Sequence, residues 1–310
     1  MEHFVTLFDK NFVLQGLALH ASMQRNISAY CLWVLCMDDE CFDLLNSLHL
    51  PNLKPLNISE FETPELLGVK GSRTKSEYCW TVTPFAPRVV FELDSLIDRV
   101  SYVDADLWFF KDPTPIFKEF EKSGKRVLIT RHDYSPEFDL SSLSGLFCVQ
   151  FIVFTRDAEI VRKNWEKQCL EWCFAKFEKG LFGDQKYLDD WPISFPDLIH
   201  VLSIPGAILA PWNATRFPLS EALCFHFHGL RVGRFIQLSG GYLLPENLIR
   251  FIYLPYISDL REIRRSLISI GSSVALQKQS LANRLLFIRW FIFRLRKLIY
   301  LLRYSFIKLY

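Results

Sequence analysis

The sequence predicts an α/β fold in which helices flank a mixed β-sheet. Apolar runs with strand character alternate with helical patterns along the first half of the chain. The chain has 310 residues, of which 50% are hydrophobic, which is enough for one large core. No internal repeat or low-complexity linker interrupts its body. We therefore expect one α/β unit over residues 1–258 and an extension over residues 259–310.

The expected elements follow one another from the N-terminus. Runs rich in β-branched and aromatic residues predict strands over residues 3–8, 29–37, 54–58, 100–103, 126–130 and 147–154, and another ending near residue 204. Apolar residues spaced by three and four predict helices over residues 12–23, 41–48, 60–67 and 157–178. The segment 75–93 is also helical in pattern, but Pro84 and Pro87 predict a kink or two short helices.

Two carboxylates follow the expected strand that ends at Val103. Asp104 and Asp106 would point to the same side of an extended segment, so they could converge on one cation. Their oxygens suit Mg²⁺ or Mn²⁺ with a phosphate as co-ligand, and ligands of open α/β sheets gather at the carboxyl ends of strands. Two solvated acids in a turn are the alternative. Asp112, followed by Pro113, is expected to cap a helix.

Basic residues are concentrated near the C-terminus. Residues 260–310 contain eleven Lys or Arg and one acidic residue, whereas the preceding residues contain 25 basic and 33 acidic ones. Arg289, Arg296 and Arg303 recur every seven residues, so residues 283–310 predict a basic amphipathic helix. Such a helix would lie on an anionic membrane surface, and a core-packing or dimerising helix is the alternative. The frequent charges argue against a membrane span, and the acidic body argues against nucleic-acid binding.

Eight cysteines lie mostly within apolar runs, and the sequence begins without a charged leader followed by an apolar core. These features predict a reduced, cytoplasmic compartment. Cys169, Cys173 and Cys224, with nearby histidines, could form a zinc site. The usual Cys-x-x-Cys spacings are missing from the sequence, which disfavours zinc.

Six segments occur in order along the chain: Thr6-Leu-Phe-Asp-Lys-Asn11, Glu77-Tyr-Cys-Trp-Thr-Val-Thr-Pro84, Tyr102-Val-Asp-Ala-Asp-Leu-Trp-Phe-Phe-Lys-Asp-Pro113, Gly183-Asp-Gln-Lys-Tyr-Leu-Asp-Asp-Trp-Pro192, Ala210-Pro-Trp-Asn213 and His226-Phe-His-Gly229. With them, about residues 3–230 resemble bacterial glycosyltransferases of the GT-A fold, close to the family 8 type and to relatives in envelope polysaccharide assembly. The resemblance implies a Rossmann-like mixed sheet that binds a nucleotide-sugar.

The resemblance also implies a metal site. Asp104, Asp106 and His226 would hold Mn²⁺, or Mg²⁺, on the diphosphate of the donor. A divalent ion there neutralises the charge on the departing nucleoside diphosphate, and an imidazole ligand shifts the preference toward Mn²⁺. His228 is the competing third ligand, because it would lie on the same face of an extended segment as His226.

Four further residues are implied to contact the nucleotide, together with Asp104. Asp9 and Asn11 follow the first strand, where such enzymes hold the nucleoside, although both are also common turn formers. Lys75 and Arg88 are candidates for contacts to the base or phosphate, with simple solvation as the alternative.

Asp184 and Gln185 match the position that faces the reacting sugar carbon, so they are the catalytic candidates. Asp184 could instead cap the helix that follows it. The family 8 likeness implies retention of anomeric configuration. An inverting route would need a carboxylate base, for which Asp133, Asp189 and Asp190 are available.

The strand over residues 147–154 departs from the family pattern. Relatives usually carry an Asn and a Gly where this chain has Cys148 and Gln150. Loss of the Asn removes a donor-sugar contact, so we expect either a different donor sugar or reduced activity.

The sequence therefore favours a metal-dependent glycosyltransferase on the cytoplasmic face of a bacterial membrane, with a lipid-linked or lipopolysaccharide-type glycan as acceptor. Two alternatives stay open. A metal-dependent phosphohydrolase or nucleotidyltransferase would act on nucleotides without a sugar, although no Gly-rich phosphate loop supports it. A noncatalytic membrane-bound protein would bind nucleotide-sugars without turnover.

Overall fold

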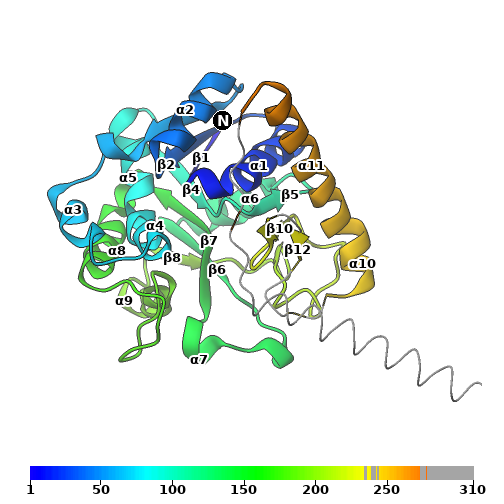
Figure 1. Cartoon of the computed structure of the whole chain (residues 1–310). Coiled ribbons are helices and arrows are strands. Elements are labelled where there is room, and N and C mark those ends of the chain that lie inside the picture. The colour runs from blue at the N-terminus through cyan, green and yellow to red at the C-terminus, as the bar shows by residue number, and fades with distance from the viewer. Residues whose placement is uncertain (234–235, 239–241, 243, 273–276, 278–310) are drawn as a thin grey trace, which may run out of the picture.

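The computed structural model describes residues 1–233, 236–238, 242, 244–272 and 277. At its centre is a seven-stranded mixed sheet in the order β3-β2-β1-β4-β7-β6-β8 (Figure 1). Its strands are β1 (Glu2–Phe8), β2 (Tyr30–Cys36), β3 (Leu53–Asn57), β4 (Arg99–Val103), β6 (Val127–Arg131), β7 (Phe147–Thr155) and β8 (Ile199–Val201). A small sheet in the order β5-β10-β9 comprises β5 (Leu107–Phe109), β9 (Ile208–Leu209) and β10 (Cys224–His226), and β11 (Arg231–Val232) pairs with β12 (Ile236–Gln237).

Helices cover both faces of the large sheet (Figure 1). One apolar core joins the sheet to α1 (Val13–Asn26), α2 (Asp39–Leu48) and α6 (Thr114–Ser123). A second core joins the opposite face to α3 (Pro64–Lys70), α4 (Lys75–Val82), α5 (Ala86–Leu93), α8 (Glu159–Glu171) and α9 (Trp191–Ser194). The remaining α-helices are α7 (Ser141–Ser144), α10 (Glu246–Leu248) and α11 (Leu254–Ser269). The expected mixed sheet with flanking helices is therefore confirmed.

Local sequence signals account for several helix boundaries. The carboxylate of Asp38 accepts a hydrogen bond from Cys41 N at 2.9 Å and so caps α2. Thr74 and Glu77 form a capping box at the start of α4. A 3₁₀ turn at Thr83–Phe85 separates α4 from α5, which confirms the break expected from the prolines.

The capping role expected for Asp112 is also confirmed. Its carboxylate accepts hydrogen bonds from the backbone N and the hydroxyl of Thr114, at 2.8 and 2.6 Å, at the start of α6. The expectation that one helix continues to residue 178 is wrong. Helix α8 already ends at Glu171, because the next residue, Trp172, is extended with φ −154° and ψ 123°. Farther along, Lys179 and Gly180 have left-handed φ angles of 50° and 82°, and Glu178 pairs with Leu181 across this turn.

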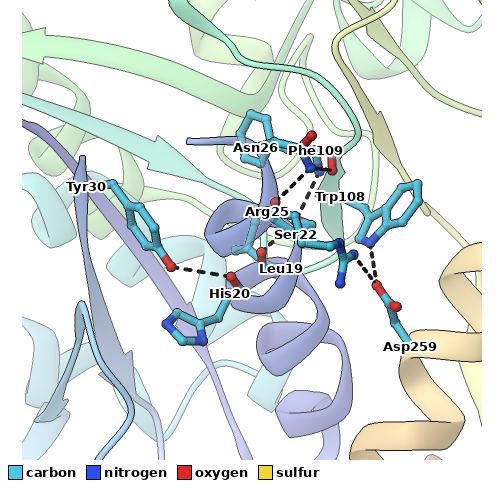
Figure 2. Close-up of polar contacts among 9 residues, drawn as sticks. All are labelled: Leu19, His20, Ser22, Arg25, Asn26, Tyr30, Trp108, Phe109 and Asp259. Atoms are coloured by element: carbon cyan, nitrogen blue, oxygen red, sulfur yellow. Dashed lines mark hydrogen bonds and ion pairs between the residues drawn. The ribbon is translucent and has the colours of Figure 1, made fainter. Parts of the chain in front are cut away.

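The helix α11 packs against α1 (Figure 1) and contacts β5 through Trp108. Figure 2 shows that Asp259 Oδ2 accepts hydrogen bonds from Arg25 Nη2 at 2.5 Å and from Trp108 Nε1 at 2.9 Å. The ring of Tyr256 stacks on that of Phe227 with centroids 3.6 Å apart. These contacts make α11 a support for β5 and for the segment that follows β10.

The expected division after residue 258 falls inside α11, and beyond it Leu260 and Leu267 are still buried. The basic helix expected over residues 283–310 lies outside the described residues. In the part of the chain that the structure describes, no helix is both long and apolar enough to cross a membrane.

Candidate metal centre

Asp104 and Asp106 lie in the short connection between β4 and β5. A turn closed by a hydrogen bond from Leu107 N to Asp104 O, at 3.1 Å, contains both residues. The sequence pattern predicted an extended segment here, and that prediction is wrong. The turn, rather than the alternation of side chains along a strand, sets the direction of the two carboxylates. Since β1 and β4 are parallel neighbours, the turn lies at the same edge of the sheet as the end of β1.

His226 reaches the two carboxylates from the small sheet. Strand β10 runs antiparallel to β5 and places His226 opposite Leu107, while Phe227 N donates to Asp106 O at 2.9 Å. His226 Nε2 lies 3.1 Å from Asp106 Oδ1 and 3.5 Å from Asp104 Oδ2. Each of the three residues offers one ligand atom, and these atoms lie within 4.8 Å of one another.

His228 takes no part in this cluster. Its side chain is exposed, and its ring centroid lies 5.7 Å from that of His226. Among the described residues, no cysteine belongs to a comparable group of three or more candidate ligands. The geometry therefore selects His226 as the third candidate ligand.

The charges of the cluster are strongly coupled. Burial raises the pKa of Asp104 to about 6, against the attraction of His226. Burial alone would also raise the pKa of Asp106, but His226 holds it below its usual value. Although burial opposes it, the charge of Asp106 raises the pKa of His226 well above its usual value. Two oxygen donors and one imidazole nitrogen at this spacing fit a divalent cation such as Mn²⁺ or Mg²⁺.

Two residues that sequence reasoning did not assign to the site contact its ligands. Tyr102 donates its hydroxyl proton to Asp104 Oδ1 at 3.0 Å, and Gln150 Oε1 lies 2.7 Å from His226 Nδ1. Tyr102 could have been found from its place near the end of β4, two residues before Asp104. Gln150 lies on β7, and no sequence signal links it to a histidine 76 residues away.

Asp184 is buried near the cluster, at the start of a 3₁₀ helix over Gln185–Asp190. Burial raises the pKa of Asp184 to about 8, and the charge of Asp104 contributes to this shift. The side chain makes no capping hydrogen bond to the helix, so the capping alternative is not supported. Instead, Asp184 O accepts from Trp165 Nε1 at 2.9 Å, which holds this segment against the core. Gln185 is half-buried.

The candidate nucleotide-contacting residues fall into two groups. Asp9 accepts hydrogen bonds from Asn11 N at 3.0 Å and from Asn11 Nδ2 at 2.7 Å, so both residues form a turn at the end of β1. Asp9 and Asn11 therefore lie at the metal edge of the sheet. Lys75 is exposed at the start of α4.

Arg88 lies elsewhere. Its guanidinium is 3.4 Å from carboxylate oxygens of both Glu92 and Glu166, in a cluster on α5 and α8 that also contains Arg162. The structure does not bring Arg88 to the metal candidates.

The three carboxylates considered for an inverting reaction differ in their surroundings. Asp189 accepts from Leu146 N at 2.7 Å and pairs with Lys186 Nζ at 2.8 Å, so its oxygens are already engaged. Asp190 is exposed. Asp133 is half-buried in the turn after β6 and has a left-handed φ of 49°.

Comparison with solved structures shows which known fold this is. The galactosyltransferase LgtC, in complex with donor and acceptor sugar analogues, superposes with a TM-score of 0.52 at 9% identity, over 91% of this chain and 99% of that chain. Mouse xyloside xylosyltransferase 1 gives a TM-score of 0.51 at 13% identity, over 79% of this chain and 99% of that chain. The chain therefore has the fold of GT-A glycosyltransferases.

Sequence comparison identifies closer relatives. No family model matches the chain. It is 29% identical over 279 residues to the uncharacterized protein YfnD of Bacillus subtilis (strain 168), covering 84% of this chain and 88% of YfnD. It is 30% identical over 281 residues to the uncharacterized protein YfnF of the same organism, covering 84% of this chain and 92% of YfnF. The chain therefore belongs to the same protein family as YfnF.

Proposed function

We propose that the protein is a metal-dependent glycosyltransferase that moves a sugar from a nucleotide-sugar donor to a lipid-linked or lipopolysaccharide-type glycan. The observation that carries this proposal is the cluster of Asp104, Asp106 and His226 at the sheet edge of a GT-A fold. Ligands of open α/β sheets collect at this edge.

The cluster would hold Mn²⁺ or Mg²⁺, which supplies charge neutralisation for the departing nucleoside diphosphate. The protein's own contribution begins with orientation of the ligands. Tyr102 holds one oxygen of Asp104 by its 3.0 Å hydrogen bond, and β10 holds His226 against Asp106. Asp9 and Asn11, at the same edge, and Lys75, exposed at the start of α4, are proposed to contact the nucleotide.

Asp184 and Gln185 are proposed to face the transferred sugar. Because burial raises the pKa of Asp184 to about 8, this side chain is mostly protonated at neutral pH without a bound ligand. A protonated carboxyl can donate a hydrogen bond to a sugar hydroxyl. We propose a retaining reaction, in line with the family 8 likeness and with the engagement of Asp189 by Lys186.

Association with the cytoplasmic face of the membrane is a further part of the proposal. On α11, Arg261, Arg264 and Arg265 are exposed, and within the described residues none of them lies within ion-pair distance of a carboxylate. Leu254 and Ile268, 54% and 56% exposed, accompany them. Basic and apolar side chains together favour an anionic lipid surface. The exposed basic face of α11, together with residues 283–310, is proposed to serve this contact.

Vesicle sedimentation tests the membrane contact. Removal of residues 283–310, combined with Arg261→Glu and Arg265→Glu, should release the protein from vesicles containing anionic lipid. Sedimentation equal to that of the unaltered chain would contradict the proposal. Neutral vesicles are the matched control for a purely apolar contact.

A donor panel tests the enzymatic proposal. Purified protein with Mn²⁺ is mixed with UDP-, GDP-, CMP- and dTDP-sugars, and nucleotide release is followed. Release from one donor should be lost in Asp106→Asn and retained in Asp157→Asn, because Asp157 is an exposed carboxylate that pairs with Arg126. Release that persists in Asp106→Asn would contradict the proposal. Hydrolysis of nucleotides without a sugar would favour a phosphohydrolase, and metal-dependent binding without turnover would favour a noncatalytic protein.

A further inference from the structure

Gln150 connects two of the three candidate metal ligands. Its backbone O accepts a hydrogen bond from Asp104 N at 3.1 Å, because β7 runs beside β4. Its side chain extends to His226, where Oε1 lies 2.7 Å from Nδ1. The side chain is fully buried, so water does not compete for this contact.

We propose that Gln150 is a positioning residue, which fixes the ring orientation and the tautomer of His226 for metal binding. This inference rests on the metal site of the proposed function. The amide oxygen accepts the proton on Nδ1, which leaves Nε2 on the side of Asp106 and Asp104, at 3.1 and 3.5 Å. A neutral imidazole with its proton on Nδ1 presents the Nε2 lone pair to the cation, whereas the opposite tautomer presents an N–H.

The ring of His226 also packs against an aromatic neighbour. The indole of Trp212 meets the His226 ring edge to face at 5.4 Å, and both side chains are buried. The thiol of Cys148 also interacts with His226. Because sulfur is a weak acceptor, loss of the Gln150 amide oxygen would remove the strong partner of Nδ1–H and would favour the form with the proton on Nε2. In metal sites, the hydrogen-bond partner of the second ring nitrogen typically fixes the tautomer and the orientation of a ligating histidine.

Position 150 departs from the family pattern, which has a Gly where this chain has Gln. From the sequence alone, this replacement is only a change near the donor sugar. In the structure, the longer side chain contacts a metal-ligand candidate directly. We infer that this chain depends on Gln150 for metal affinity, which a glycine could not supply.

The first test is Mn²⁺ binding, measured by electron paramagnetic resonance of the free ion. Gln150→Met keeps similar length and removes the acceptor, so it should lower Mn²⁺ affinity about 10- to 100-fold. Gln150→Glu keeps an acceptor oxygen and should retain affinity within a few-fold of the original chain. Gln15→Met is the matched control, because Gln15 is also buried but contacts none of the three ligands among the described residues.

Unchanged affinity in Gln150→Met would overturn the inference. An equal loss in Gln150→Met and Gln15→Met would also overturn it, because the effect would then be general destabilisation. A loss in Gln150→Met that Gln150→Glu rescues supports the positioning role.

The second test needs neither metal nor turnover. In protein labelled with ¹⁵N-histidine, long-range ¹H–¹⁵N spectra show which ring nitrogen carries a proton, and His226→Asn assigns the signal. In the metal-free original chain both ring nitrogens of His226 should be protonated, because the charge of Asp106 raises its pKa. In Gln150→Met, Nδ1–H has lost its acceptor, so a neutral form with the proton on Nε2 alone should appear. Unprotonated Nδ1 in the original chain would overturn the inference. If Nδ1 behaves as expected but no Mn²⁺ binds, the proposed metal function fails while the role of Gln150 in orienting His226 stands.

Discussion

Replacing Asp184 by asparagine should stabilise the metal-free protein at alkaline pH. Burial raises the pKa of the Asp184 carboxyl from 3.8 to about 8, so the folded protein holds a proton that the unfolded chain releases at lower pH. The stability associated with this proton is fully present below pH 3.8 and is lost as the pH rises to about 8. An asparagine carries no charge at any pH and avoids this loss.

The size of the effect follows from the two pKa values. One pKa unit corresponds to 1.36 kcal/mol, so the difference between 3.8 and about 8 corresponds to at most about 6 kcal/mol of unfolding free energy. Relaxation of the site around the charged carboxylate reduces this difference to roughly 2–5 kcal/mol. Asp184→Asn should therefore exceed the original chain in unfolding free energy at pH 8.5 by this amount. At pH 3.5 the two should differ by less than about 1 kcal/mol, since both side chains are then uncharged.

Urea denaturation in EDTA at pH 3.5, 6 and 8.5 measures these differences. Asp190→Asn is the control, because Asp190 is exposed on the same 3₁₀ helix. The reasoning would be refuted if Asp184→Asn gained no stability relative to the original chain between pH 3.5 and pH 8.5. It would also be refuted if Asp190→Asn showed the same gain.

Three further substitutions test the fold around the site. Thr74→Ala removes the capping box of α4 and should lower the unfolding free energy by about 1 kcal/mol, measured by urea denaturation; no change would contradict the capping role. Glu166→Ala removes the nearest carboxylate of the buried Arg162 and leaves only Glu159, at 4.0 Å, so it should cost about 3–5 kcal/mol in the same assay; a loss below about 1 kcal/mol would contradict this account. Asp259→Ala removes the acceptor that Arg25 and Trp108 share, so it should lower the unfolding free energy by about 1–3 kcal/mol and speed amide hydrogen exchange in α11. Unchanged exchange would show that other contacts hold the helix.

Much of the fold could be predicted from the sequence because its signals are local. Strand β2 is buried throughout, so its apolar run is continuous, and it alternates with helices whose caps are visible in the sequence. The kink between α4 and α5 follows from proline geometry. The end of α8 at Glu171 was missed because no Gly or Pro marks it in the sequence: the chain leaves the helix at the extended Trp172, and the next Gly is Gly180.

The site could be predicted only in part. The motif pattern located Asp104, Asp106 and His226, but the local geometry at the carboxylates is a turn rather than a strand. Strands of two or three residues, such as β9 and β10, carry too little periodicity to be recognised. Their pairing with β5 nevertheless brings His226 to carboxylates about 120 residues earlier, which is a tertiary effect that residue patterns do not encode locally.

Two other assignments show the same limit. Arg88 looked available for a phosphate because the sequence does not reveal that Glu92 and Glu166 already pair with it. Gln150 looked only like the replacement of a family Gly, because its distance from His226 along the chain concealed a 2.7 Å hydrogen bond. Both residues are placed by the packing of helices and strands that are distant in sequence.

The central claim is that the Asp104, Asp106 and His226 cluster holds a divalent cation. The most direct measurement is pulsed electron paramagnetic resonance of one equivalent of Mn²⁺ added to the protein, which detects ¹⁴N of a directly bound imidazole. We predict a ¹⁴N coupling that disappears in His226→Gln and persists in His228→Gln. No ¹⁴N coupling in the original chain, or a coupling that is lost only in His228→Gln, would contradict the account.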